Sequence, residues 1–352
     1  MNAFKFGTMV SGEFFTDRIA ESEFICQKLN SENHLILISP RRYGKSSLVR
    51  KCLTEINRPY IWLDLQYVLS TTDFAEKMLK AVLSLYPYER IKYEISHFRI
   101  VPTFSTSPLS NEWQISFQPS ADTSVLLEDV MRLVEHVSSP DRRLVVVLDE
   151  FQEVCNIDKN LDKQLRSLMQ QQQGLNYIML GSQESMMHEI FEQKKSPFYH
   201  FGQLMHLHKI PYDDFYQFVF SRLPDVPSKD TITAAILSFT QCHPYYTQQL
   251  ASQVWDNLSY KGITERIIEE SIAEIVQEHD LDYERLWNNL NRTDRSVILL
   301  LSKAQKPLQN KSVSTSTTFS ALKRLQKSGI IIRDNSGYQI EDPFFMHWLL
   351  KS

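Results

Sequence analysis

Cysteine is scarce in this 352-residue sequence, and the few cysteines lie far apart. They are Cys26, Cys52, Cys155 and Cys242, and no two of them form a C-x-x-C pair. Such spacing predicts neither a cysteine-based zinc motif nor a disulfide framework. A reducing cytoplasm is the compartment that fits this cysteine usage best.

Long uncharged apolar runs are also missing, so no segment is expected to cross a membrane. The first ten residues lack the apolar core and cleavage site of a secretory signal. We therefore expect a soluble cytoplasmic protein without a membrane partner. The sequence does not predict its oligomeric state.

The bulk composition is that of a folded protein of two or three domains, because 42% of the residues are hydrophobic. The formal net charge of −4 hides an asymmetry. Residues 285–352 contain eleven Lys and Arg against four Asp and Glu, whereas the rest of the chain is acidic. A basic terminal module on an acidic body indicates a separate binding function for that module.

The most informative segment is residues 35–48, LILISPRRYGKSSL, in which an apolar run turns and enters a helix. This layout predicts a phosphate-binding P-loop. Backbone N–H groups of the turn would surround the β-phosphate, Lys45 would reach the β and γ oxygens, and Ser46 would supply a hydroxyl to Mg²⁺. The predicted nucleotide-binding residues of the segment are Ser39, Pro40, Arg41, Arg42, Tyr43, Gly44, Lys45, Ser46 and Ser47.

One residue departs from the full motif G-x-x-x-x-G-K-[ST], because Ser39 stands where the first glycine is expected. A bare Gly-Lys-Ser is weak on its own. The preceding strand, the following helix and a second motif downstream favour a true P-loop.

That second motif is residues 142–151, RRLVVVLDEF, a valine-rich run that ends in two carboxylates. Continuous apolar character is typical of a parallel strand buried on both faces. At its carboxyl end Asp149 is placed to hold the Mg²⁺ shell, and Glu150 to orient or deprotonate the attacking water. The alternative is a core strand that ends in a solvated acidic turn.

Further strands are expected at residues 60–65, 176–180 and 203–207, which would complete a parallel five-stranded sheet of the α/β class. The turn Gly181-Ser182-Gln183 follows one of them, and Ser182 or Gln183 would read the γ-phosphate from there. The alternative is a turn whose polar side chains are satisfied locally.

Between these strands, an amphipathic helix is expected from about Phe74 to Leu85, with Thr71, Thr72 or Asp73 as its cap. Residues 89–120 alternate apolar and polar positions around a Ser/Pro/Asn turn, which predicts a β-hairpin insertion.

After the sheet, residues 211–280 read as all-helical. Within this stretch Pro244 is well placed to begin a helix. His243, just before it, is predicted either to face a nucleotide phosphate or to serve as a capping or core histidine.

The last segment predicts a helix at 293–304, a second at 317–327, and a hairpin that turns at 335–337. Two helices and a hairpin suggest a winged helix-turn-helix. On the second helix Lys323, Arg324 and Lys327 would contact DNA phosphates. The side chains expected to approach base edges are Ser314, Thr315, Ser316 and Thr318. A solvated charged face or a protein-binding module are the alternatives.

Taken in order, six short motifs resemble the archaeal-type ATPase family of prokaryotes, which belongs to the AAA-like signal-transducing P-loop ATPases and is similar to origin-recognition ATPases. The motifs are FTDR at 15–18 with Glu21, SPRRYGKSS at 39–47, LDEFQ at 148–152, LGSQ at 180–183, HPYY at 243–246 and EDPFFMHWL at 341–349.

The resemblance implies a P-loop ATPase core at 1–210, a helical lid at 211–284 that closes over the nucleotide, and a winged helix-turn-helix domain at 285–352. It also implies ATP as the nucleotide, Mg²⁺ as its companion, and an adenine site next to Arg18. Family members often carry Gly-Arg after Pro-x-Tyr, where this sequence has His200 and Phe201. Loss of an arginine that would stabilise transition-state charge favours slow turnover.

The expected function is thus an ATP-dependent switch with slow hydrolysis, coupled to the winged helix. The alternative is a nucleotide-gated adaptor for DNA or for a protein partner, with negligible turnover. No guanine-reading motif and no second catalytic constellation accompany the P-loop.

Overall fold

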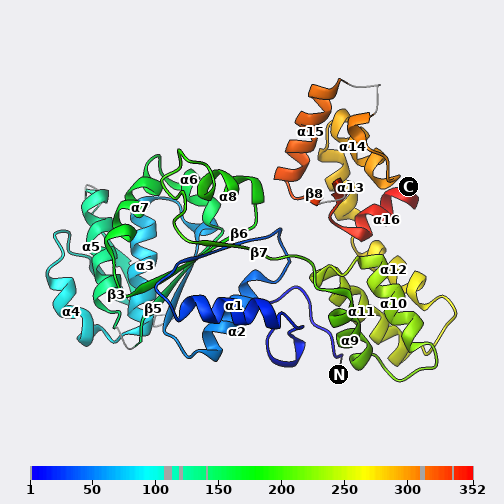
Figure 1. Cartoon of the computed structure of the whole chain (residues 1–352), viewed down its shortest axis with the longest axis horizontal. Coiled ribbons are helices and arrows are strands. Elements are labelled where there is room, and N and C mark those ends of the chain that lie inside the picture. The colour runs from blue at the N-terminus through cyan, green and yellow to red at the C-terminus, as the bar shows by residue number, and fades with distance from the viewer. Residues whose placement is uncertain are drawn as a thin grey trace. The chain divides into compact units, whose positions relative to one another are not determined.

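The computed structural model describes residues 2–106, 113–118, 122–139, 142–309, 314–334 and 337–351 (Figure 1). The chain divides into two compact units. We call them the sheet unit, Ile19–Ser39 with Leu48–Leu207, and the helical unit, Met1–Arg18 with Pro40–Ser47 and His208–Ser352. No helix among the described residues is long and apolar enough to span a membrane.

The sheet unit is built on a parallel five-stranded sheet with strand order β2-β5-β6-β1-β7. Its strands are β1 Leu35–Ile38, β2 Tyr60–Asp64, β5 Leu144–Asp149, β6 Leu175–Gly181 and β7 Gln203–His206. The inner strands are apolar almost throughout because both of their faces are covered. The predicted α/β class and five-stranded parallel core are confirmed.

Helices cover both faces of this sheet (Figure 1). On one side lie α1 Ile19–Leu29 and α2 Lys45–Glu55. On the other lie α3 Thr71–Leu85, α5 Thr123–His136, α6 Val154–Ile157, α7 Leu161–Gln171 and α8 Glu184–Phe191. Short 3-10 turns occur at Gly12–Phe14, Leu65–Tyr67, Phe151–Glu153 and Pro307–Gln309.

The start of α3 corrects one expectation. Ser70 caps this helix, since its hydroxyl accepts a hydrogen bond from the Asp73 N–H at 3.1 Å. Thr71, Thr72 and Asp73 lie inside the first turn instead. Ser70 satisfies an N–H group that the helix itself leaves unpaired.

The insertion is a helix followed by a hairpin. Residues Tyr88–Ser96 form α4, where we expected irregular or extended chain, because Ile91 and Ile95 fall on one helical face and are buried. The predicted hairpin is present as antiparallel β3 Thr103–Thr106 and β4 Trp113–Ser116, and its turn lies outside the described residues. Arg99 ties the insertion to α5 through two hydrogen bonds to Asp129, at 2.8 and 2.9 Å.

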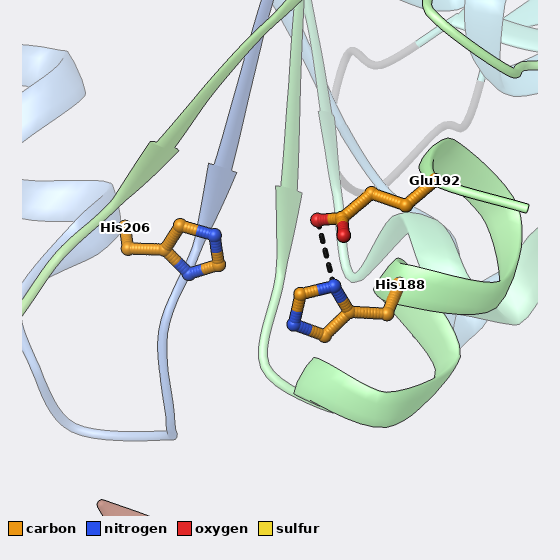
Figure 2. Close-up of side chains that lie close together, drawn as sticks. All are labelled: His188, Glu192 and His206. Carbon is orange, nitrogen blue, oxygen red and sulfur yellow. Dashed lines mark ion pairs between the residues drawn. The ribbon is translucent and has the colours of Figure 1, made fainter. Parts of the chain in front are cut away.

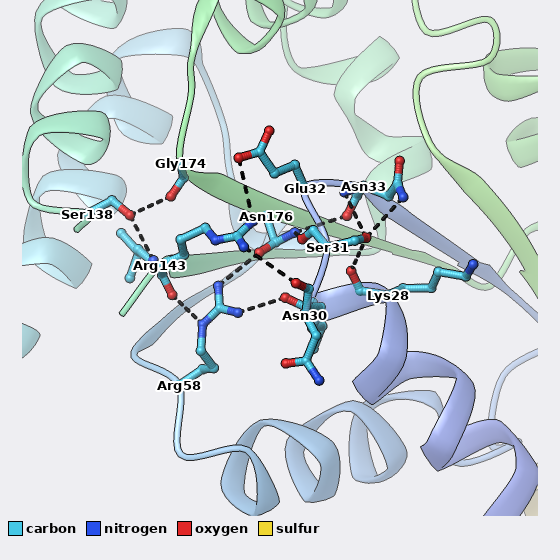
Figure 3. A network of polar contacts seen from close by, with 12 residues as sticks. Lys28, Asn30, Ser31, Glu32, Asn33, Arg58, Ser138, Arg143, Gly174 and Asn176 are labelled. Atoms are coloured by element: carbon cyan, nitrogen blue, oxygen red, sulfur yellow. Dashed lines mark hydrogen bonds and ion pairs between the residues drawn. The ribbon is translucent and has the colours of Figure 1, made fainter. Parts of the chain in front are cut away.

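A polar network fixes the edge of the sheet at which its central strands begin (Figure 3). Asn176, fully buried in β6, donates to the carbonyls of Ser31 and Asn33 and accepts from the Arg58 guanidinium at 2.8 Å. Arg58 also donates to the carbonyl of Arg143, the residue before β5. Buried polar groups are tolerated only when paired in this way, so the network holds the strand starts in register.

The helical unit contains α9 Tyr212–Arg222, α10 Lys229–Thr240, α11 Pro244–Tyr260, α12 Ile267–Glu278 and α13 Asp280–Asn289. It continues through α14 Arg292–Ser302, α15 Thr315–Lys327, the hairpin β8 Ile331–Asp334 with β9 Gly337–Ile340, and α16 Pro343–Lys351. These elements confirm the predicted winged helix.

One apolar core runs through the whole helical unit. Phe344 and Phe345 of α16 are buried within it, with the Phe344 ring 5.3 Å from that of Phe239 in α10. The amino-terminal segment joins the same core through Phe4, and Asn2 donates to the carbonyl of Ser252 in α11. Helices α9 to α13 and the winged helix therefore share one apolar core.

Candidate functional site

The predicted P-loop lies between β1, which ends at Ile38, and α2, which begins at Lys45. Its backbone needs left-handed conformations at Arg42, with φ 66°, and at Gly44, with φ 87°. A glycine adopts this geometry without the Cβ strain that a side chain would add. Ser39 does not have a positive φ, and its N–H donates to the Gly181 carbonyl at 3.3 Å. The structure thus explains why a serine is accepted at the position of the first motif glycine.

The side chain of Lys45 is buried and folds back over the loop. Its Nζ donates to the Pro40 carbonyl at 2.9 Å. This hydrogen bond joins the second residue of the turn to the start of α2. Next to it the Ser47 hydroxyl accepts the Val10 N–H at 3.1 Å. The Ser47 hydroxyl is thus used by the chain itself, and Ser46 as the magnesium ligand remains a prediction.

Arg18 supports the loop from within the helical unit. Its guanidinium donates to the carbonyl of His208 at 2.6 Å and to that of Tyr43 at 3.4 Å. Asp17 and Arg18 both have positive φ, at 42° and 67°. Such conformations cost roughly 1–3 kcal/mol each and persist where the surroundings impose them. Arg18 is thus a structural clamp on Tyr43, and its contact with adenine remains a prediction.

Carboxylates gather where β2 and β5 end. Asp149 is the last residue of β5, and its register partner in β2 is Asp64, a carboxylate that the sequence analysis did not consider. Glu150 follows in a left-handed conformation with φ 51° and ψ 46°. A non-glycine residue in this region is uncommon and points to a constrained position.

The Glu150 carboxylate is held by two partners. The Ser182 hydroxyl donates to Glu150 Oε2 at 2.6 Å, and the Gln152 amide donates to the same oxygen. The structure therefore brings the predicted residues Glu150 and Ser182 together. Gln152 is a site residue that sequence reasoning missed, although its motif LDEFQ was recognised.

Gln183 completes this corner as the residue before α8. Its Oε1 atom is buried and has no hydrogen-bond partner among the described residues. An unsatisfied buried amide oxygen lowers the stability of the folded state by about 1–3 kcal/mol, so this position favours a bound polar group. Nearby, a Cβ at Gly181 would overlap the side chain of Met187, so α8 packs directly on the end of β6.

The order of the strands relates these groups to the loop. Strands β5, β6 and β1 are consecutive neighbours and run parallel. Asp149, Ser182 and Ser39 therefore all leave the sheet at its carboxyl edge, where open α/β sheets bind ligands.

A second set of contacts links the loop to α11. The Arg42 guanidinium lies 4.4 Å from the ring centroid of Tyr245, and its Nη1 donates to the Tyr246 hydroxyl at 3.4 Å. Tyr43 packs edge-on against His243 with ring centroids 4.9 Å apart. The P-loop arginine thus stacks on the first turn of α11.

His243 is buried and caps α11. Its Nδ1 accepts the N–H groups of Tyr245 and Tyr246 at 3.1 and 3.4 Å, so Nε2 carries the proton and donates to Glu341 Oε1 at 2.9 Å. Burial lowers the pKa of His243, although the Glu341 carboxylate opposes the shift. These bonds account for the capping alternative, and Pro244 occupies the first helical position as expected.

Glu341 and Asp342 were not assigned roles from the sequence, yet they join the winged helix to this cluster. Asp342 accepts the N–H groups of Phe344 and Phe345 at 2.8 and 3.1 Å and the Tyr283 hydroxyl at 3.3 Å. Burial raises the pKa of Asp342, and the nearby Arg42 acts against that shift. A charged residue of the loop therefore interacts with an acid of the winged helix.

The predicted DNA-contacting face of α15 needs one correction. Thr318 is buried in the helix packing and cannot reach base edges. Arg324 is exposed but ion-paired, with Nη2 2.7 Å from Oδ1 of the buried Asp294, and its contact with phosphate remains a prediction. Lys323 and Lys327 are exposed, as are Thr315 and Ser316, whereas the exposed Ser314 uses its hydroxyl to cap α15.

The segment that lacks an arginine lies at the opposite end of the sheet. The Phe201 ring stacks on His34, which immediately precedes β1, at a centroid distance of 4.5 Å. The Arg166 guanidinium covers the same ring at 4.9 Å. Burial and Arg166 lower the pKa of His34 to about 4. Phe201 thus lies beside the beginning of β1, and the P-loop follows the opposite end of that strand.

Two family models match the chain. Residues 28–186 match the AAA domain, and residues 282–351 match a probable winged helix domain. A comparison of the sequence with curated proteins gave no match.

Several solved structures share the fold. A Walker-type ATPase of Pyrococcus abyssi is 18% identical with a TM-score of 0.66, over 96% of this chain and 97% of that one. The ORC2 protein of Aeropyrum pernix, in ADPNP-ADP complexes, is 13% identical with a TM-score of 0.57, over 99% and 100%. The ORC1 protein of the same organism, in complex with DNA, is 10% identical with a TM-score of 0.51, over 97% and 93%.

The P-loop and the Asp-Glu strand lie within the residues that match the AAA domain, and α15 with the β8–β9 hairpin lies within those that match the winged helix domain. Residues 28–186 therefore form an AAA domain and residues 282–351 a probable winged helix domain, and the chain as a whole shares the fold of the similar archaeal Walker-type ATPase and ORC2 structures.

Proposed function

We propose that this protein is a nucleotide-dependent switch that binds Mg·ATP at residues 39–47, hydrolyses it slowly, and passes the state of the loop to its winged helix. One series of contacts carries the proposal. Arg42 of the loop stacks on Tyr245 of α11, the cap of α11 is His243, and His243 donates to Glu341 of the winged helix.

Binding of the phosphates rests on the loop and the start of α2. Backbone N–H groups there face an anion, and Lys45 exchanges its bond to the Pro40 carbonyl for the β and γ oxygens. The similar ORC2 structure contains ADPNP and ADP, which supports a nucleotide at this position. The preference for adenine, with Arg18 beside it, follows from the family resemblance.

Hydrolysis is assigned to groups at the carboxyl edge of the sheet. Ser46 and Asp149 would hold Mg²⁺, whose charge offsets that of the phosphate oxygens. Glu150 orients the attacking water, and Ser182 or Gln183 contacts the γ-phosphate. The Ser182–Glu150 hydrogen bond supports this pairing, because a hydroxyl that leaves Glu150 for a phosphate frees the carboxylate to accept from water.

Transmission to the winged helix follows from the position of Arg42. A bound nucleotide adds negative charge beside a loop whose arginine is shared between the Tyr245 ring and the Asp342 carboxylate. A shift of Arg42 toward phosphate weakens its stacking on Tyr245 of α11 and its attraction to Asp342, which precedes α16. The loop and the winged helix are therefore coupled by charge as well as by packing.

Calorimetry with Mg·ATP tests the binding step. Wild-type protein should bind, and Lys45→Ala should lose about ten- to hundredfold in affinity, since a hydrogen bond to a charged group contributes about 1.5–3 kcal/mol. Lys51→Ala, at a partly exposed position on α2 where Lys51 pairs with Glu55, serves as the matched control. Equal binding by wild type and Lys45→Ala would remove the basis of the proposal.

A second candidate is a nucleotide-gated adaptor with negligible turnover, favoured by His200 and Phe201 where family members often have Gly-Arg. Steady-state phosphate release with and without duplex DNA separates the two. Release that DNA changes supports the switch. Binding without release supports the adaptor, for which DNA is one partner, as with ORC1, and a protein is the other.

A further inference from the structure

A cluster of two imidazoles and a carboxylate lies outside the proposed nucleotide site. His188 is on α8, Glu192 is the residue that directly follows this helix, and His206 is the last residue of β7. One ligand atom of each residue lies within 4.8 Å of the others. Figure 2 shows the two rings facing each other across a gap that Glu192 borders.

The backbone explains why these side chains converge. Glu192 caps the end of α8 with its N–H on the carbonyl of His188, four residues earlier, and this last turn places Glu192 Oε1 2.6 Å from His188 Nδ1. The His188 and His206 rings are nearly parallel, at 27°, with centroids 5.6 Å apart. Because an imidazole lone pair lies in the plane of its ring, one of the two rings must turn before both can direct a nitrogen at the same ion.

Both elements that carry the ligands are rigidly seated. Helix α8 is anchored by the buried Met187, Ile190 and Phe191, and Met187 packs against Gly181 of β6. Strand β7 pairs with β1 along its length, with His206 opposite Ile38. Ligands on such elements need only side-chain rotation to close on an ion.

We propose that His188, Glu192 and His206 bind a divalent transition metal such as Zn²⁺, in a three-ligand site whose fourth position is open to water. Imidazole nitrogens about 2.0–2.1 Å and a carboxylate oxygen about 2.0–2.2 Å from the ion are the ordinary ligands of Zn²⁺. Mg²⁺ prefers oxygen ligands, so this site is chemically distinct from the proposed magnesium site at Ser46 and Asp149.

The bound ion would cross-link α8 to an edge strand of the sheet. Since β7 has a neighbour only in β1, a metal bridge to α8 adds a second attachment at the end where β1 gives way to the P-loop. The expected consequence is stabilisation of the folded state that rises with metal concentration.

Titration of the full-length, chelator-treated protein with Co²⁺, without nucleotide, tests the proposal. One equivalent should give the visible absorption of nitrogen- and oxygen-ligated Co²⁺, and Zn²⁺ should displace it while excess Mg²⁺ should not. Calorimetry with Zn²⁺ should give the same stoichiometry, and Zn²⁺ should raise the unfolding temperature.

Three variants identify the ligands. His188→Ala, His206→Ala and the near-isosteric Glu192→Gln should each weaken binding by at least about tenfold. The matched control is His136→Ala, because His136 also faces a glutamate, Glu94, at 3.7 Å but has no third ligand within the part of the chain that the structure describes. Cys155→Ser tests whether the exposed thiol contributes, since a thiolate gives a distinct ultraviolet band.

The result that overturns the proposal is equally specific. Binding that persists in both His188→Ala and Glu192→Gln, which alter only exposed side chains of α8 and of the residue that follows it, would place the ion elsewhere. Absence of any Co²⁺ or Zn²⁺ equivalent in the wild type would show that the cluster is only an ion pair beside a histidine.

Discussion

His243 donates through Nε2 to Glu341 at 2.9 Å while its Nδ1 accepts two backbone N–H groups at the start of α11. Only the neutral ring with its proton on Nε2 satisfies both demands. The buried histidine therefore connects α11 to the winged helix, and its protonation state affects both the cap of α11 and the bond to Glu341.

Low pH should weaken this connection between α11 and the winged helix. Burial lowers the pKa of His243 in the folded protein, so the unfolded chain binds the proton more tightly. The stability that His243 contributes is therefore present above its ordinary pKa of about 6.5 and is lost as the pH falls toward the folded-state value. Urea unfolding from pH 7.5 to 5 should show this loss in the wild type.

His243→Asn is the control for that titration, because asparagine can cap the helix but does not ionise. Its stability should fall less between pH 7.5 and 5 than that of the wild type. A wild-type protein whose stability falls no more than that of the variant would contradict the assignment.

Glu150→Gln should keep ATP binding and lose turnover, since the amide cannot accept a proton from water. General-base contributions are typically about 10²–10⁴-fold, which sets the expected drop in phosphate release. Ser182→Ala should leave binding within about tenfold and also slow release, because it removes the partner that positions Glu150. Unchanged hydrolysis in Glu150→Gln would rule out its role.

Arg42→Ala should separate nucleotide binding from its effect on the winged helix. The variant retains Lys45 and the backbone of the loop but loses the stacking on Tyr245, a contact of about 0.5–2 kcal/mol. Hydrogen exchange with and without Mg·ATP should show a change at α11 and α16 in the wild type, and little or none in the variant. Arg41→Ala, exposed on the same loop, is the comparison. An equal exchange response in Arg42→Ala and wild type would refute the coupling.

On the winged helix, the lysines and the arginine of α15 should behave differently. If DNA is the partner, Lys323→Ala and Lys327→Ala should each reduce the salt dependence of binding, by roughly 0.9 in the slope of log K against log salt. Arg324→Ala should instead destabilise the fold by about 1–2 kcal/mol, because it removes a partner of the buried Asp294. Fluorescence anisotropy at several salt concentrations and urea unfolding measure the two effects. Identical behaviour of all three variants would contradict the distinction.

The sequence predicted the sheet and its ligand edge well because parallel buried strands leave a continuous apolar signature. LILI before the P-loop and LVVVLD before Glu150 are examples. Boundaries were less certain where side chains compete, as at Ser70, which caps a helix that three following residues were equally suited to begin.

Contacts between distant segments were beyond the reach of the sequence. Nothing local to Arg324 reveals that its partner is Asp294, thirty residues earlier, or that Thr318 faces the core. The same holds for His243 and Glu341, both in motifs that were recognised, whose pairing depends on how α16 packs against the lid.

The continuous apolar core of the helical unit also limits how such a protein diversifies. Phe344 and Phe345 are buried in the same core as helices α9 to α13. Exchange of residues 285–352 for an unrelated module would therefore expose apolar side chains of those helices. Related proteins can therefore change their partner by substitutions at exposed positions of α15 and of the β8–β9 hairpin. Replacement of the whole winged helix would require a matching change in the helices that share its core.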